Sequence, residues 1–146
     1  MYGKYDRTID EKNRLVIPSK FRNELGNTFF ITYGLDSSIT VRNQEQFDLL
    51  TKKISENNLL DKNVRQFSRY IFANTEEVSV DKSGRITLPQ RFIDKAAIKK
   101  DVVFIGLGNI SEIFAKEVYE QTEAMINEEE NFDQLAQSLF ESGIKL

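Results

Sequence analysis

One thirteen-residue pattern occurs twice in this chain, at residues 9–21 and 80–92, and it constrains the fold more than any other feature. Each copy contains an apolar residue, an Asp, three polar residues, an Arg, an apolar-x-apolar triplet, a Pro and, three positions later, a Phe. The copies are 71 residues apart in a chain of 146. Repetition at a fixed spacing is typical of a duplicated structural unit. We therefore expect two similar halves.

Each copy predicts a strand, a tight turn, a second strand and a short helix. Asn13 and Gly84 precede the arginines of the two copies, and both residue types tolerate the positive φ of tight turns. The apolar alternation that follows buries one face of a strand. Proline cannot donate to a sheet but suits the first position of a helix. The residues that these helices are expected to bury are Phe21 and Leu25 in the first copy, and Phe92 with Ile93 or Ala96 in the second.

The remaining elements follow a similar order in both halves, and the predicted fold class is mostly β with added α-helices, an α+β fold. β-branched and aromatic runs predict further strands at residues 28–33, 39–41, 77–80, 85–88, 102–105 and 112–114. Asn43 and Asp61 are expected to cap two helices that join the halves. The expected apolar stripes of these helices are Phe47, Leu50 and Ile54, and Val64, Phe67 and Ile71.

Two helices are predicted at the end of the chain, at residues 116–126 and 131–140. The last of them is amphipathic, and its apolar residues are Phe132, Leu135, Ala136, Leu139 and Phe140. An apolar helix face needs a surface to cover. That surface is expected on the protein's own body or on a neighbouring subunit, and the sequence leaves both open.

Composition argues against several functional classes. A hydrophobic fraction of 40 % and eleven Phe support a packed core rather than disorder. The chain has no Cys and no His, which removes disulfides, thiolate metal sites and the commonest general base. We therefore expect neither an enzyme nor a cofactor. Residues 1–7 contain no apolar run typical of a signal peptide, and no segment approaches the ~18 apolar residues of a membrane span, so we expect a cytoplasmic protein.

The charge is unevenly distributed along the chain. The formal net charge is -3, but residues 1–111 contain 18 basic and 14 acidic side chains, whereas residues 112–146 contain 2 basic and 9 acidic ones. An acidic C-terminal segment thus masks a mildly basic body. Because the local field at a contact face attracts phosphate, the net charge does not exclude a nucleic-acid partner.

The duplicated Asp-x-x-x-Arg, the apolar-x-apolar-Pro after each copy, the chain length and the two C-terminal helices resemble the MraZ family. The resemblance covers nearly the whole chain. It implies two pseudo-symmetric SpoVT/AbrB-like swapped-hairpin β-barrel units, at residues 5–47 and 76–119, followed by an acidic helical segment at 120–146. The first copy departs from the family pattern because Asn13 stands where a Gly usually precedes the Arg.

The resemblance also implies a function. A member of this bacterial family is expected to be a sequence-specific DNA-binding transcriptional regulator and a ring-shaped homo-oligomer. It would bind double-stranded DNA at promoter repeats of the division and cell-wall gene cluster, in association with the nucleoid, with no membrane and no small-molecule substrate. The alternative is a non-enzymatic assembly or protein-interaction module in which the Asp-Arg hairpins are scaffold. An enzyme ranks third.

The family signature falls on Asp10 and Arg14 in the first copy and on Asp81 and Arg85 in the second. One interpretation is a structural salt bridge, and exposed pairs of this kind contribute only ~0–1 kcal/mol. The other is that the Asp orients one edge of the guanidinium while its remaining donors meet a base or a phosphate. Further cations in or beside the hairpins, which form either a DNA-binding track or an ordinary solvated face, are Lys4, Arg7, Lys12 and Lys82.

Three other features of the sequence have plain structural interpretations. Arg65 and Arg69 are expected to face solvent or to form pairs between helices. The segment 106–108, Gly-Leu-Gly, lacks the third glycine or the Lys-Ser/Thr of nucleotide-binding loops and is predicted to be a turn. The acidic run Glu128–Glu130 is expected to complement a helix dipole rather than to bind a metal ion.

Overall fold

The computed structural model describes residues 1–127 and 129–144. At residues 129 and 130 it describes only the backbone. The chain divides into two compact units, Met1–Lys116 and Glu117–Leu146. Both copies of the repeated pattern lie in the first unit. The two copies of the pattern therefore fold together within one compact unit.

The first unit contains the strands and short helices predicted from the sequence. In chain order its elements are β1 (Lys4–Thr8), β2 (Arg14–Val16), α1 (Ser19–Leu25), β3 (Thr28–Tyr33), the 3-10 helix η1 (Leu35–Ser37), β4 (Ile39–Arg42), α2 (Gln44–Ser55), α3 (Lys62–Ala73), β5 (Thr75–Ser79), β6 (Arg85–Thr87), α4 (Gln90–Lys95), β7 (Asp101–Gly106) and β8 (Ser111–Ala115). The strands predicted at 28–33, 39–41, 77–80, 85–88, 102–105 and 112–114 are confirmed with small shifts at their ends. The predicted α+β class is confirmed as well.

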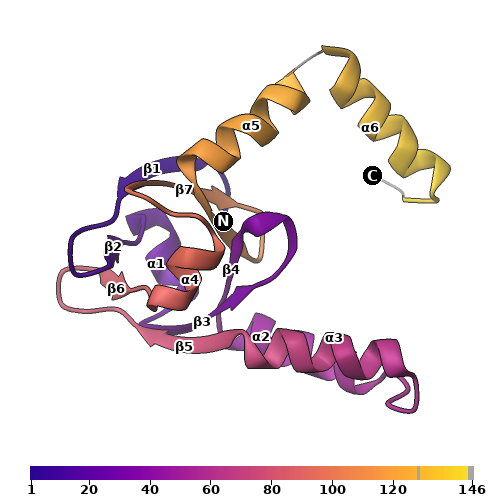
Figure 1. Cartoon of the computed structure of the whole chain (residues 1–146), viewed down its shortest axis with the longest axis horizontal. Helices are drawn as coiled ribbons and strands as arrows, with labels where there is room; N and C mark the ends of the chain where they lie inside the picture. Colours follow the sequence, from indigo (N-terminus) through magenta and orange to yellow (C-terminus); the bar gives the residue numbers. More distant parts are fainter. Residues whose placement is uncertain (128, 145–146) are drawn as a thin grey trace. The chain divides into compact units, whose positions relative to one another are not determined.

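The strands form two antiparallel sheets that interlock the two halves (Figure 1). The larger sheet has the order β1-β7-β8-β4-β3-β5, and the smaller one pairs β2 with β6. In the larger sheet β1 of the first copy pairs with β7 of the second, and β5 of the second copy pairs with β3 of the first. Each copy thus gives its first strand to the other copy. The expectation of two swapped-hairpin units in one chain is confirmed.

The strand-turn-strand unit predicted for the first copy is not a hairpin whose two strands pair with each other. Its turn is present, because the N–H of Asn13 donates to the carbonyl of Asp10 at 3.0 Å and the N–H of Asp10 donates to that of Arg14 at 3.0 Å. Its two strands, however, form ladders with β7 and β6 rather than with each other. The reason is burial: pairing β2 with β6 places Leu15 opposite Ile86 on one inward face, where they are 0 % and 1 % exposed.

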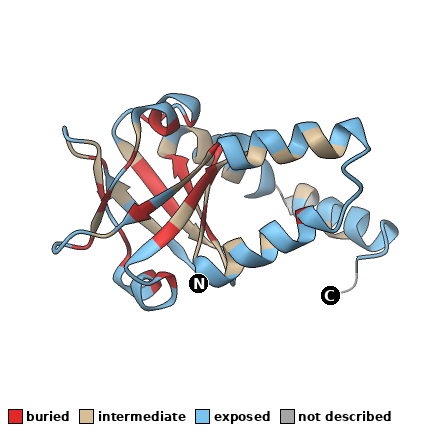
Figure 2. Ribbon diagram, turned by 90° about the horizontal axis from the view of Figure 1, so that it is seen from below, coloured by how far each residue is buried: buried red, intermediate tan, exposed pale blue. Residues whose placement is uncertain are grey.

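The core of the first unit lies along the inward face of these strands (Figure 2). Phe21 and Phe92, which occupy equivalent positions in the repeat, are each 1 % exposed. The Phe21 ring meets Tyr5 edge-on, with centroids 5.2 Å apart. The predicted burial of both phenylalanines is confirmed, as is that of their helical neighbours Leu25, Ile93 and Ala96.

The helices α1 and α4 each begin one residue later than predicted, directly after the proline. Pro18 and Pro89 are the N-cap residues of α1 and α4 rather than the first helical residues, with ψ of 130° and 144°. Their carbonyls accept hydrogen bonds from the N–H groups of Phe21 and Phe92 at 2.9 and 3.0 Å. An extended N-cap whose carbonyl accepts the first helical bond explains the shift. The helix after each proline is confirmed.

The two helices that join the halves begin at the predicted caps. The side chain of Asn43 accepts from the N–H of Gln46 at 2.9 Å, and that of Asp61 accepts from the N–H of Asn63 at 2.8 Å. Ile54 of α2 is buried, but Phe67 of α3 is 51 % exposed. The apolar stripe predicted for α3 is therefore only partly covered within the described chain.

The second unit consists of most of α5 (Lys116–Asn127) and of α6 (Glu129–Glu141), which confirms the two predicted helices. On α6, Phe132 and Phe140 are 60 % and 58 % exposed. The acidic run Glu128–Glu130 lies outside the residues whose side chains are described. Among the described residues, no helix has the length and apolar character needed to cross a bilayer.

Candidate nucleic-acid interface

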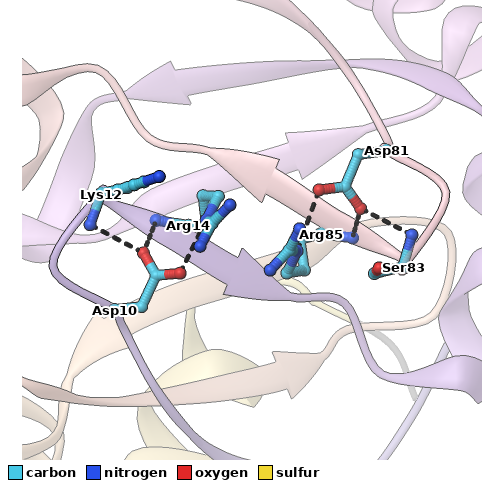
Figure 3. A network of polar contacts seen from close by, with 6 residues as sticks. All are labelled: Asp10, Lys12, Arg14, Asp81, Ser83 and Arg85. Carbon is cyan, nitrogen blue, oxygen red and sulfur yellow. Dashed lines mark hydrogen bonds and ion pairs between the residues drawn. The ribbon is translucent and has the colours of Figure 1, made fainter.

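The first repeated turn is built around the carboxylate of Asp10 (Figure 3). Its Oδ1 accepts from the backbone N–H groups of Lys12 and Arg14 at 2.9 and 2.8 Å, and its Oδ2 accepts from Nε of Arg14 at 2.7 Å. Asn13 adopts a φ of 62°, which closes the turn. One carboxylate therefore holds both the loop backbone and one edge of the guanidinium.

The second turn repeats this geometry. Oδ1 of Asp81 accepts from the N–H groups of Ser83 and Arg85 at 2.9 and 3.0 Å, and Oδ2 accepts from Nε of Arg85 at 2.9 Å. Gly84 adopts a φ of 76°. The match confirms that Asn13 and Gly84 have equivalent roles, and it confirms the predicted Asp-Arg pairs.

Both aspartates stay ionised at neutral pH. Their pKa values lie below the ordinary value of 3.8, chiefly because the backbone N–H of Arg14 or Arg85 donates to the carboxylate. Hydrogen bonds from the paired guanidinium and from the N–H of Lys12 or Ser83 lower the pKa further, against a desolvation effect that raises it. Hydrogen bonds to the charged form favour that form.

The arginines lie on the outer face of the ribbon formed by β2 and β6. The register pairs Arg14 with Thr87 and Val16 with Arg85, while Leu15 and Ile86 point into the core. Figure 3 shows the two pairs along the ribbon, with the arginines between the two aspartates. Each arginine side chain is 30 % exposed. Within the described chain only Nε of each guanidinium has a hydrogen-bond partner, which leaves the terminal Nη donors of both arginines available.

Each turn is also held by the opposite copy. The N–H of Ile17 donates to the carbonyl of Gly84 at 2.9 Å, and the N–H of Leu88 donates to the carbonyl of Asn13 at 2.8 Å. The side-chain amide of Asn13 also donates to Oε1 of Gln90 at 3.2 Å. These crossed bonds hold the two arginine-bearing loops in one rigid ribbon.

The other predicted site residues divide between two places. Lys12 and Lys82 lie in the turns beside the arginines, and both are exposed. Lys4 and Arg7 lie instead on β1, an edge strand of the larger sheet. There Nη1 of Arg7 donates to the carbonyl of Asp6 at 2.8 Å. The structure therefore gathers the turn cations with the Asp-Arg pairs but places Lys4 and Arg7 on a different sheet.

One cation beside this ribbon was missed in the sequence. Nη1 of Arg22, from α1 of the first copy, lies 2.7 Å from the point where a Cβ on Gly84 would be. Its guanidinium thus lies against the turn of the second copy. The sequence signal is weak, because Arg22 is merely an exposed residue of a short helix 62 positions before Gly84.

Two other arginines of this unit donate to backbone carbonyls. Nη1 of Arg65 donates to the carbonyls of Leu59 and Leu60, each at 2.9 Å, so it closes the loop between α2 and α3. Arg91 donates to the carbonyl of Ala73 at 2.9 Å and pairs with Glu76 at 3.3 Å. Arg69 is exposed, as predicted.

The Gly-Leu-Gly segment and the acidic side chains are the two remaining features that the sequence singled out. The segment 106–108 is a turn, as predicted, in which the N–H of Leu107 donates to the carbonyl of Ile110 at 2.9 Å. In the part of the chain that the structure describes, no cluster of three acidic side chains could hold a metal ion.

A two-stranded antiparallel ribbon with arginines on its outer face is an architecture of β-ribbon DNA-binding proteins, which place such a ribbon in a DNA groove. The family model described as "MraZ protein, putative antitoxin-like" matches the chain twice, over residues 1–70 and 71–141. The chain therefore belongs to the MraZ family. The two matches begin 70 residues apart, close to the 71-residue offset of the repeat.

Full-length relatives support the same assignment. The transcriptional regulator MraZ of Mycoplasma mobile is 51 % identical over 100 % of both chains. That of Mycoplasmopsis pulmonis is 41 % identical over 99 % of this chain and 98 % of its own, and that of Clostridium tetani is 38 % identical over 97 % and 98 %. The family is one of transcriptional regulators and not of enzymes.

Proposed function

We propose that this chain is a sequence-specific DNA-binding transcriptional regulator that acts as a ring-shaped homo-oligomer. Its target would be double-stranded DNA containing repeats in the promoter of the division and cell-wall gene cluster. The observation that carries the proposal is the β2–β6 ribbon, whose outward arginines are anchored by Nε and keep their Nη donors available. The names of its relatives as transcriptional regulators support the same function.

The ribbon suits the major groove of DNA, which is wide enough to admit a two-stranded β-ribbon. Arg14 and Arg85 are diagonal neighbours across it, because Arg14 lies opposite Thr87 and Arg85 opposite Val16. A guanidinium can donate two parallel hydrogen bonds to O6 and N7 of a guanine, which discriminates against other bases by ~1–3 kcal/mol. The pair would therefore contact neighbouring base steps.

The aspartates would act as positioning residues for this contact. Each fixes the Nε edge of its arginine through Oδ2 and fixes the turn backbone through Oδ1. A side chain that is already ordered loses less conformational entropy on binding. Asp10 and Asp81 would thus raise affinity without touching DNA.

The neighbouring cations would bind phosphate. Lys12 and Lys82 flank the arginines in the turns, and Arg22 lies against the second turn. Lys4 and Arg7 on β1 would extend the track along the body. Each phosphate neutralised releases counterions and makes the binding more dependent on salt.

The proposed architecture follows the repeat. Residues 5–47 and 76–119 would be the two SpoVT/AbrB-like DNA-binding units, and residues 120–146 an acidic C-terminal helical segment. A ring would present the two turns of every subunit at regular intervals, which suits repeated DNA sites, and closed symmetry avoids open filaments. The protein would act in the cytoplasm in association with the nucleoid.

The test compares Arg14→Ala and Arg85→Ala with the wild type on a promoter fragment and on a scrambled fragment of equal length. Each variant should bind the promoter fragment more weakly and lose preference over the scrambled one, while oligomer mass and melting temperature stay near the wild-type values. Arg69→Ala removes an exposed arginine from α3 and serves as the matched control. Light scattering should show particles several times the 16.9 kDa chain mass.

The competing function is an assembly module in which the Asp-Arg pairs only stabilise the turns. The carboxylate bonds to the turn backbone give that possibility specific support. It requires Arg14→Ala and Arg85→Ala to unfold the protein or dissociate the oligomer. Wild-type binding of the promoter by both variants, with an unchanged salt dependence, would show that the ribbon does not touch DNA.

A further inference from the structure

A cavity outside the proposed DNA-binding surface lies on the opposite face of the six-stranded sheet from the core. Its volume is about 390 Å³, within the range of small-molecule pockets. The apolar part of its lining comes from η1, α2, α3 and the β7–β8 turn, namely Leu35, Leu50, Phe67, Ile71, Leu107 and Ile110. The sheet contributes polar side chains to the lining, among them Thr32 and Thr40.

Three charged residues line this cavity, namely Arg42 and Glu112 of the sheet and the exposed Asp36 of η1. Arg42 lies at the end of β4, and Glu112 lies on β8 opposite Thr40, so the two are diagonal neighbours on one face of the sheet. Nothing among the described residues accepts a hydrogen bond from the Arg42 guanidinium, and the two charges form no ion pair. The hydroxyl of Ser38 donates to Oε2 of Glu112 at 2.6 Å, which holds the carboxylate in place.

Arg42 is a half-buried cation with no hydrogen-bond partner among the described residues. Burial lowers the pKa of its guanidinium, and the charge of Glu112 offsets this only in part. Arg42 is only half-buried, so its five N–H donors have water or a ligand in the cavity as acceptors. The DNA-binding proposal makes no use of this residue, because it lies on β4 and not on the ribbon.

We propose that this cavity binds a small zwitterion of the amino-acid class with an apolar side chain. Its carboxylate would accept from Arg42, its ammonium group would donate to Glu112, and its side chain would cover Phe67 and Ile71. A simple anion would be repelled by Glu112 and Asp36, and a simple cation by Arg42. An uncharged apolar ligand would leave both charges desolvated, so only a ligand with both charges complements the site.

The first test measures the binding of three related probes to the full-length protein. Binding is measured by calorimetry and by the NMR shifts of the backbone amides of the pocket residues. L-phenylalanine contains both charges, 3-phenylpropanoate lacks the ammonium group, and phenethylamine lacks the carboxylate. L-phenylalanine should bind saturably and shift the amides of Thr32, Thr40 and Arg42. Each truncated probe should bind roughly ten- to a hundredfold more weakly, as expected for one lost hydrogen bond to a charged group.

The second test uses variants that keep side-chain size. Arg42→Met and Glu112→Gln should each weaken L-phenylalanine binding to the same extent as the missing probe group, whereas Arg69→Met should leave it unchanged. Melting temperatures should stay close to the wild-type value. If Arg42→Met does not fold, Glu112→Gln and the three probes still decide the question.

Several results would overturn the proposal. They are absence of saturable binding up to about 10 mM L-phenylalanine, equal binding of the three probes, and wild-type binding by the folded variants. A change of oligomer mass in Arg42→Met would show that a neighbouring subunit fills the cavity instead. None of these readouts involves DNA, so the outcome is independent of the DNA-binding proposal.

Discussion

Replacing Gly84 by Ala tests whether the second Asp-Arg turn needs its left-handed residue. Gly84 has a φ of 76°, where an L-residue places its Cβ too close to the following carbonyl. The new Cβ would also lie 2.7 Å from Nη1 and 3.0 Å from Cζ of Arg22. Because that guanidinium is the far end of a flexible side chain, it can move away at little cost.

The size of the stability loss in Gly84→Ala therefore depends mainly on the cost of the left-handed backbone conformation. A left-handed conformation costs an L-residue about 1–2 kcal/mol. Alanine also lowers the conformational entropy of the unfolded chain, which offsets about 0.4–1 kcal/mol of that cost. We expect a net loss of about 1 kcal/mol in the free energy of unfolding. For a chain near this size, that loss lowers the melting temperature by about 3 °C.

The matched control is Gly84→Asn, because Asn13 occupies the equivalent position of the first copy with a φ of 62°. Asparagine enters the left-handed region more readily than alanine. Differential scanning calorimetry should therefore place Gly84→Asn between the wild type and Gly84→Ala. A wild-type melting temperature for Gly84→Ala, or a lower one for Gly84→Asn than for Gly84→Ala, would refute the reasoning.

Three further predictions concern the ribbon and its surroundings. Arg22→Met should reduce the steepness of the plot of log affinity for DNA against log salt concentration by about one unit. Arg91→Met should leave this slope unchanged, because the Arg91 guanidinium already bonds Ala73 and Glu76. Equal slopes for the two variants would exclude Arg22 from the interface. The folded-state pKa values of Asp10 and Asp81 lie below 3.8, so their contribution to stability is complete above that pH and is lost as the pH falls through the folded values. Thermal melts at decreasing pH should show a smaller acid loss in the Asp10→Asn, Asp81→Asn double variant, and an identical loss would contradict this linkage. Pro89→Ala should cost about 0.4–1 kcal/mol through unfolded-state entropy, as measured by denaturant unfolding, and an unchanged or higher stability would contradict the role of Pro89 as an N-cap with fixed φ.

Much of the local structure could be predicted from residues that lie close together in the sequence. The turn at Asp10–Arg14 depends on a carboxylate four residues before the arginine and on Asn13, which tolerates positive φ. The same spacing at Asp81–Arg85 predicts the same turn in the second copy. The caps at Asn43 and Asp61 are equally local, because each bonds an N–H within three residues. Such features depend on short-range sterics and hydrogen bonds.

Pairing between the halves was decided by the tertiary structure. The sequence predicts a strand at residues 85–88 but contains no local signal that it pairs with β2, or that β1 pairs with β7 about a hundred residues later. Strand partners at that distance are selected by which arrangement buries both apolar faces at once. The family resemblance supplied the swapped topology that local patterns do not contain.

The same reason explains which candidate residues the sequence could and could not identify. Arg14 and Arg85 stand out because they recur in a repeated motif, whereas Arg22 meets Gly84 only after the two halves interlock. Arg42 and Glu112 are ordinary strand residues in the sequence, and they face one cavity only because β4 and β8 are neighbours in the sheet. Sequence by itself determined the turns, the caps and the duplicated Asp-Arg motif. The tertiary structure decided which distant side chains meet, because that depends on burial summed over the whole sheet rather than on any one segment.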